Sequence, residues 1–196
     1  MKNLPRIKIG APTVVFIVLL IILDKSLLSL LAFAAAFVHE LGHIVTMLFI
    51  GTKVSEIEIT FFGAEIRTHA VSQGIFASIV IFASGAVANI LSAVIVYTLP
   101  SASFEALFFA GASLSLAVLN LLPIRTLDGG CILEAVLIPI IPQNAPLILD
   151  IISSLTLGAL WLTAVYLLLI ANGNLSLMLF CMYLFVTLFL RGDREE

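Results

Sequence analysis

The sequence predicts an all-α polytopic membrane protein, with about six transmembrane helices and a small β-hairpin between the second and third. Composition is the first reason, because 62% of the 196 residues are hydrophobic, only 11% are charged, and the mean hydropathy is +1.24. About a quarter of the residues in an ordinary soluble domain are charged. The second reason is that long apolar runs alternate with short polar or turn-rich breaks. Length suggests one domain, so we expect residues 1–196 to form a single membrane-embedded domain.

Six apolar runs are long enough, or nearly long enough, to cross the hydrocarbon core of a bilayer. They cover Thr13–Leu23, Leu27–Ile50, Gly74–Leu99, Phe104–Leu122, Leu147–Ile170 and Leu175–Leu190. The first run is short for a full crossing and could extend into Ile7–Ala11 or tilt less than its neighbours. Basic residues precede it, as in a signal peptide, but no small-residue cleavage site follows, so we expect a retained span.

The basic residues predict how these spans are oriented. Lysine and arginine concentrate in cytoplasmic loops. With six spans and a cytoplasmic N-terminus, all the basic residues except Lys25 fall on one side. Those residues are Lys2, Arg6, Lys8, Lys53, Arg67, Arg125, Arg191 and Arg194. We therefore expect a multi-pass protein of the cell membrane whose N- and C-termini are both cytoplasmic.

The connection between the second and third spans has the pattern of a β-hairpin. Within Val54–Phe62, Glu56 and Glu58 alternate with Ile57 and Ile59, which is strand periodicity. Gly63 offers a turn, and Ala64–His69 can return as a second short strand. A hairpin cannot lie in lipid with bare edges, so it must lie at the interface or under helices. There it could bind an extended peptide by strand addition. A simple amphipathic connector is the alternative.

The middle of the second span carries His39, Glu40 and His43. Two imidazoles and a carboxylate are costly at that depth, so packing alone is a poor reason for them. Their spacing is HExxH, and positions four apart share a helix face. Both imidazoles can therefore bind one metal ion while Glu40 stands beside it. A chance HExxH is the alternative, but a hydrophobic span disfavours it because buried polar groups need compensation. We expect one Zn²⁺ per chain, with Glu40 as the catalytic base.

Gly42, inside the same motif, predicts close packing of helices. Without a side chain it lets another helix approach the second span. Gly85 and Ala88 on the third span can provide the matching small-residue surface.

A catalytic zinc site needs three protein ligands and one open position. Asp128 is the favoured third ligand because it lies in Asn120–Gly130, where a proline and two glycines interrupt an apolar run. Broken backbone at membrane depth is tolerated where it lines a protein cavity. The alternatives are an ordinary helix-boundary turn for Asp128 and an interhelical hydrogen bond for Asn120. His69, in the polar hairpin, is more typical of a solvated or interfacial histidine.

In combination, these motifs resemble the site-2 protease family of intramembrane zinc metalloproteases. The family pattern is HExxH on one span and NxxPxxxxDG on a later one, and it matches His39–His43 and Asn120–Gly129. Phe62-Gly63 in the hairpin and Gly85–Asn89 on the third span, similar to the family's GxxxN, also fit. The layout looks closest to the compact branch that processes sporulation-type transcription-factor precursors.

The resemblance implies an intramembrane zinc endopeptidase that acts in regulated intramembrane proteolysis. His39, His43 and Asp128 would bind the metal, and Glu40 would transfer the proton. Asn89 and Asn120 would contact the oxyanion or the substrate backbone. Three positions depart from residues common in the family, and none is a ligand. They are Ala64, Ala86 and Cys131.

Two other functions could use the same buried residues. A divalent-metal transporter could carry its ion on His39, His43 and Asp128, but it gives Glu40 no role, and the spans show no internal repeat. A catalytically silent scaffold would use the metal only for folding. We expect a membrane-protein or membrane-associated peptide as substrate and lipid as surroundings. The net charge of −3 and the lack of a basic patch argue against nucleic acid. Whether a regulatory membrane partner binds the protein stays open.

Overall fold

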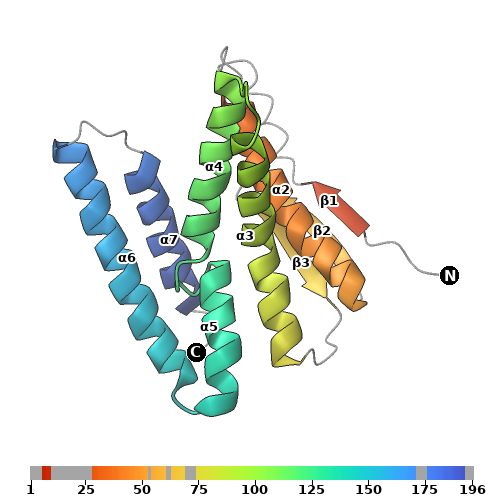
Figure 1. Ribbon diagram of the computed structural model, residues 1–196. Helices are drawn as coiled ribbons and strands as arrows, with labels where there is room; N and C mark the ends of the chain where they lie inside the picture. Colours follow the sequence, from red (N-terminus) through yellow and green to blue (C-terminus); the bar gives the residue numbers. More distant parts are fainter. Residues whose placement is uncertain are drawn as a thin grey trace. The chain divides into compact units, whose positions relative to one another are not determined.

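The computed structural model describes residues 6–9, 28–52, 54–60, 63–68, 74–170 and 176–192. These residues form three strands and six helices (Figure 1). In chain order they are β1 (Arg6–Ile9), α2 (Leu28–Ile50), β2 (Val54–Thr60), β3 (Gly63–Thr68), α3 (Ile75–Tyr97), α4 (Phe104–Asn120), α5 (Asp128–Ile140), α6 (Ala145–Ile170) and α7 (Ser176–Gly192). The chain divides into two compact units, Met1–Leu119 and Asn120–Glu196. The single membrane-embedded domain stays a prediction.

Three helices in the described part of the chain, α2, α3 and α6, are long and apolar enough to cross a membrane. α4 and the Leu177–Leu188 part of α7 are shorter apolar helices. These five helices coincide with the second to sixth predicted spans. The first predicted span, Thr13–Leu23, lies outside the described residues. Arg6–Ile9 forms a strand, so an extension of that span into these residues is wrong.

In the first unit, α2 and α3 pack side by side (Figure 1). They approach closely at Gly42, where an added Cβ would lie 2.6 Å from the carbonyl oxygen of Ser84 and 2.9 Å from Cβ of Ala88. The predicted small-residue contact is therefore confirmed. Each helix buries a stripe of residues close to four positions apart, as expected when two helices meet along i±4 rows. The stripes are Ala35, His39, His43 and Met47 on α2, and Ile81, Gly85, Ala86, Asn89 and Ala93 on α3.

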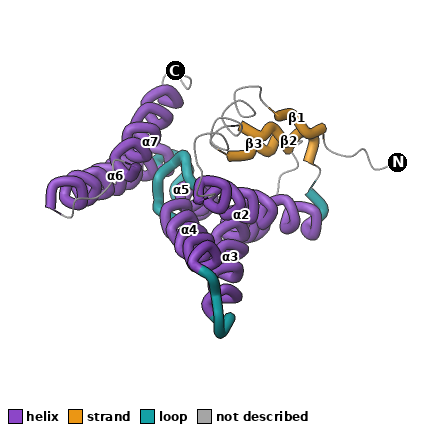
Figure 2. Tube along the Cα trace, turned by 90° about the horizontal axis from the view of Figure 1, so that it is seen from above, coloured by secondary structure: helices purple, strands orange, loops and turns teal. Residues whose placement is uncertain are grey.

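The three strands form one sheet in the order β1-β2-β3. β2 and β3 are antiparallel, and the pairing of Thr60 with Gly63 leaves only two residues between them. β1 pairs with β2 in parallel. Figure 2 shows the sheet on one side of α2, and β3 contacts this helix. β1 was not predicted, because it is four residues long and its partner comes more than 40 residues later in the chain.

In the second unit, α6 packs against both α5 and α7. Ile124, Leu157, Ala164, Cys181 and Leu184 form its buried core. α5 was not predicted from the sequence as a separate helix. Its 13 residues begin with two glycines after Asp128 and contain Pro139 near the end, which together are more typical of a loop.

Candidate metal centre

His39 and His43 lie one turn apart on the buried face of α2, with exposed fractions of 4% and 6%. Their Nε2 atoms are 3.2 Å apart, and the two rings meet edge to face. The two imidazoles thus share one face of the helix, as the HExxH spacing predicts.

The separation of these two nitrogens fits a zinc ion. In a tetrahedral site with Zn–N bonds of about 2.0–2.1 Å, two nitrogen ligands lie about 3.3–3.4 Å apart. The observed 3.2 Å is close to that value. Neutral imidazole nitrogens are also among the ligands that zinc prefers.

Gly85 on α3 lies directly against this pair. A Cβ added there would meet Nε2 of His43 and would lie 2.8 Å from Nε2 of His39. Any side chain at this position would therefore occupy the space next to both Nε2 atoms. From the sequence, Gly85 was expected only to allow helix packing, and this second role was missed although the GxxxN motif contained the signal.

Backbone and side-chain oxygens of α3 orient His43. Its Nδ1 lies 2.8 Å from the carbonyl oxygen of Ile81 and donates to it, which leaves the lone pair on Nε2. Ser84 Oγ donates to the same carbonyl at 2.6 Å and lies 3.5 Å from Nδ1. This support was missed because a backbone carbonyl acceptor has no signature in the sequence.

His39 meets a different group of α3. Its Nδ1 lies 3.4 Å from Nδ2 of Asn89, which is fully buried. Asn89 therefore contacts a predicted metal ligand directly.

The other predicted site residues are less buried. Glu40 follows His39 on α2 and is half-buried. Asn120 is the last residue of α4, and Asp128 is the first residue of α5, both half-buried. Asp128 belongs to the second unit, so its role as third ligand stays a prediction. Phe62 and His69 lie outside the described residues.

The structure as a whole is similar to that of the site-2 protease from Methanocaldococcus jannaschii. The TM-score is 0.62 at 19% sequence identity, and the match covers 93% of this chain and 88% of that one. The chain has a site-2 protease-like fold. No family model matches the sequence, and no curated protein does. The similarity is therefore one of fold and is not visible in the sequence as a whole.

In this site-2 protease-like fold, Asp128 follows a sharp turn. An added Cβ at Gly129 would collide with the backbone of Leu121, and one at Gly130 with the backbone of Ile124. The glycine pair therefore lets residues 121–127 fold back onto the first turn of α5. This is a structural reason for the glycines that follow the aspartate.

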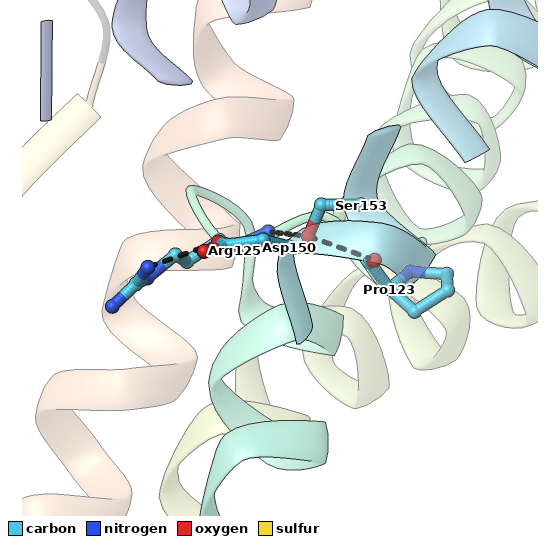
Figure 3. A network of polar contacts seen from close by, with 4 residues as sticks. All are labelled: Pro123, Arg125, Asp150 and Ser153. Atoms are coloured by element: carbon cyan, nitrogen blue, oxygen red, sulfur yellow. Dashed lines mark hydrogen bonds and ion pairs between the residues drawn. The ribbon is translucent and has the colours of Figure 1, made fainter. Parts of the chain in front are cut away.

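The same turn is tied to α6 (Figure 3). The backbone N–H of Arg125 donates to Ser153 Oγ at 3.0 Å, and that hydroxyl lies 3.5 Å from the carbonyl oxygen of Pro123. The Arg125 guanidinium forms an ion pair with Asp150 at 2.9 Å. We call Arg125, Asp150, Ser153 and Pro123 the α6 clamp. It holds the segment that leads to Asp128.

Proposed function

We propose that this chain is an intramembrane zinc endopeptidase. It would hydrolyse peptide bonds within or near the transmembrane segments of membrane-protein substrates. The observation that carries the proposal is the pair of buried imidazoles of His39 and His43, whose Nε2 atoms converge at 3.2 Å within an apolar helix that also bears Glu40. The site-2 protease-like fold supports it.

The proposed metal site holds one zinc ion, bound by His39, His43 and Asp128. Two neutral imidazoles and one carboxylate are a donor set that zinc accepts in catalytic sites. Such a bound ion supplies Lewis acidity and makes water a nucleophile near neutral pH.

The chain's own residues would supply the proton transfer and the binding of charge. Glu40 would accept the proton of the attacking water and pass it to the leaving amine. Asn120 would donate its amide N–H to the developing oxyanion or to the substrate backbone. A helical substrate must unwind locally, because its peptide groups are hydrogen-bonded within the helix.

The proposed surroundings are a lipid bilayer. We propose six spans with both termini in the cytoplasm, and the sheet formed by β1, β2 and β3 at the membrane interface. The apolar character of α2, α3 and α6 supports this arrangement, as does the rule that bare strand edges are excluded from lipid.

The decisive experiment compares wild type with Glu40→Gln in detergent or nanodiscs, loaded with zinc and given a candidate transmembrane peptide. We expect Glu40→Gln to retain zinc and to lose about 10²-fold or more of the cleavage rate, because the general base is gone. Glu134→Gln on α5 is the matched control and should cleave like wild type.

The same variant tests the rival functions. Zinc flux into liposomes that persists in Glu40→Gln, without peptide cleavage by the wild type, would contradict a protease and favour a transporter. Cleavage at the wild-type rate by Glu40→Gln would show that this carboxylate is not the base.

A further inference from the structure

Asn89 has an unusual environment for an amide. Its side chain is fully buried on α3, one turn beyond Gly85, and Nδ2 lies 3.4 Å from Nδ1 of His39. No residue in the described part of the chain donates a hydrogen bond to its Oδ1. A buried amide oxygen without a donor is costly, so its position needs a reason.

The direction of the amide decides which nitrogen of His39 can bind a metal. With Nδ2 facing His39, the amide donates to Nδ1, and the single proton of the neutral ring is on Nε2. That Nε2–H can then donate to Nε2 of His43 at 3.2 Å. In this arrangement neither Nε2 lone pair is available to a cation.

Turning the amide by half a rotation exchanges its nitrogen and oxygen at nearly the same positions. Oδ1 of Asn89 then accepts a hydrogen bond from Nδ1–H of His39, and the lone pair of His39 is on Nε2. His43 already has that form, because its Nδ1–H donates to the Ile81 carbonyl at 2.8 Å. Both Nε2 lone pairs would then point into the space beside Gly85.

From this contact, and resting on the proposed function, we infer that Asn89 is a positioning residue for zinc. Its Oδ1 holds His39 in the tautomer that presents Nε2. Each imidazole thus has its own acceptor on α3, the Ile81 carbonyl for His43 and the Asn89 amide for His39. Acceptors of this kind fix ring orientation and raise ligand basicity in metal sites. The role differs from contact with oxyanion or substrate, which would need an amide exposed to the substrate.

The test measures zinc affinity of the purified full chain by competition with a chromogenic chelator. Asn89→Leu keeps the branched outline of the side chain but removes the acceptor, and we expect zinc binding about 10–100-fold weaker. Asn89→Asp keeps an acceptor at the same place and should stay close to wild type. Ser92→Ala is the control on α3, because that hydroxyl donates only to the Ala88 carbonyl of its own helix, and it should not change affinity.

The visible absorption of bound Co²⁺ provides a second readout, since a changed ligand geometry alters the d–d bands. We expect changed bands in Asn89→Leu and wild-type bands in Asn89→Asp. Equal zinc affinity in wild type and Asn89→Leu would overturn the inference about Asn89 alone. An Asn89→Asp variant as weak as Asn89→Leu would overturn the acceptor role. A wild type that binds no zinc would instead overturn the proposed function.

If Asn89→Leu does not fold, the wild type decides. In ¹⁵N-histidine spectra of the zinc-loaded protein, a proton on Nδ1 of His39 would support the inference. Zinc bound through Nδ1 would overturn it.

Discussion

At the scale of single residues, the candidate metal centre depends on an absent side chain as much as on the donors. His39 and His43 could share a helix face in any helix, because that follows from four-residue spacing. Their nitrogens have room to converge on a cation only because position 85 carries no Cβ. Gly42 adds to this by letting α3 approach within contact of α2.

Gly85→Ala is therefore expected to disturb the candidate metal centre more than the fold. The new methyl would press on both imidazoles, and overpacking of this kind costs about 1–3 kcal/mol. We expect zinc affinity to fall about 5–150-fold if that cost appears in metal binding. Chelator competition measures it. Gly158→Ala on α6 is the control, because an added Cβ there meets nothing within 4 Å. Wild-type affinity in Gly85→Ala would contradict the argument.

At the residue scale, some features of the candidate site could be predicted from the sequence and others could not. The HExxH motif predicted the shared face because helical periodicity is local, and the structure has that geometry. It could not predict that the Ile81 carbonyl orients His43, because backbone acceptors are the same at every position. It could not predict that Asn89 faces His39 either, since that contact depends on the rotation of α3 about its axis.

At the scale of elements, an irregular turn precedes α5 in the second unit. Residues 121–127 fold back over Gly129 and Gly130, and the α6 clamp holds them. Proline and paired glycines predicted a break here, but not that a helix begins at Asp128 directly after it. Local propensity is unfavourable for such a start, and the tertiary contacts of the turn outweigh it. β1 was missed for a similar reason, because only distant pairing makes it a strand.

Ser153→Ala tests the clamp. The substitution removes the hydrogen bond that the Arg125 backbone N–H donates to Ser153 Oγ in the part-buried turn, so we expect a loss of about 1–3 kcal/mol in unfolding free energy. Asp150→Asn should cost less, about 1 kcal/mol or below, because the Asp150 side chain is 50% exposed.

The control is Thr163→Ala, also on α6, whose hydroxyl donates to the Ala159 carbonyl of the same helix and is exposed. It should change stability by about 0.5 kcal/mol or less. Denaturant unfolding in mixed micelles measures all three variants. Equal stability of Ser153→Ala and Thr163→Ala would show that the clamp does not stabilise the turn.

At the scale of the whole molecule, the helices expose many large apolar side chains, and this exposure would be unfavourable in water. Phe49 of α2 is 88% exposed, Phe76 of α3 79%, and Leu169 of α6 74%. Extensive apolar surface on a protein marks a contact with another apolar medium or partner. Composition alone predicted this. The number and direction of the crossings stay predictions, because they depend on residues outside the described parts of the chain.

The proposed zinc stoichiometry concerns the whole molecule, because the proposed ligands come from distant parts of the chain. His39 and His43 lie on α2, and the proposed third ligand, Asp128, begins α5 more than 80 residues later. Removing a carboxylate that binds the metal directly should lower zinc occupancy well below one ion per chain, so Asp128→Ala is expected to lose most of its metal on dialysis. Glu134→Ala, which removes a carboxylate from the same helix, should retain it. Elemental analysis of never-chelated protein measures both. Full occupancy in Asp128→Ala would mean that another residue completes the site, whereas equal loss in Glu134→Ala would point to damage to α5 and not to a lost ligand.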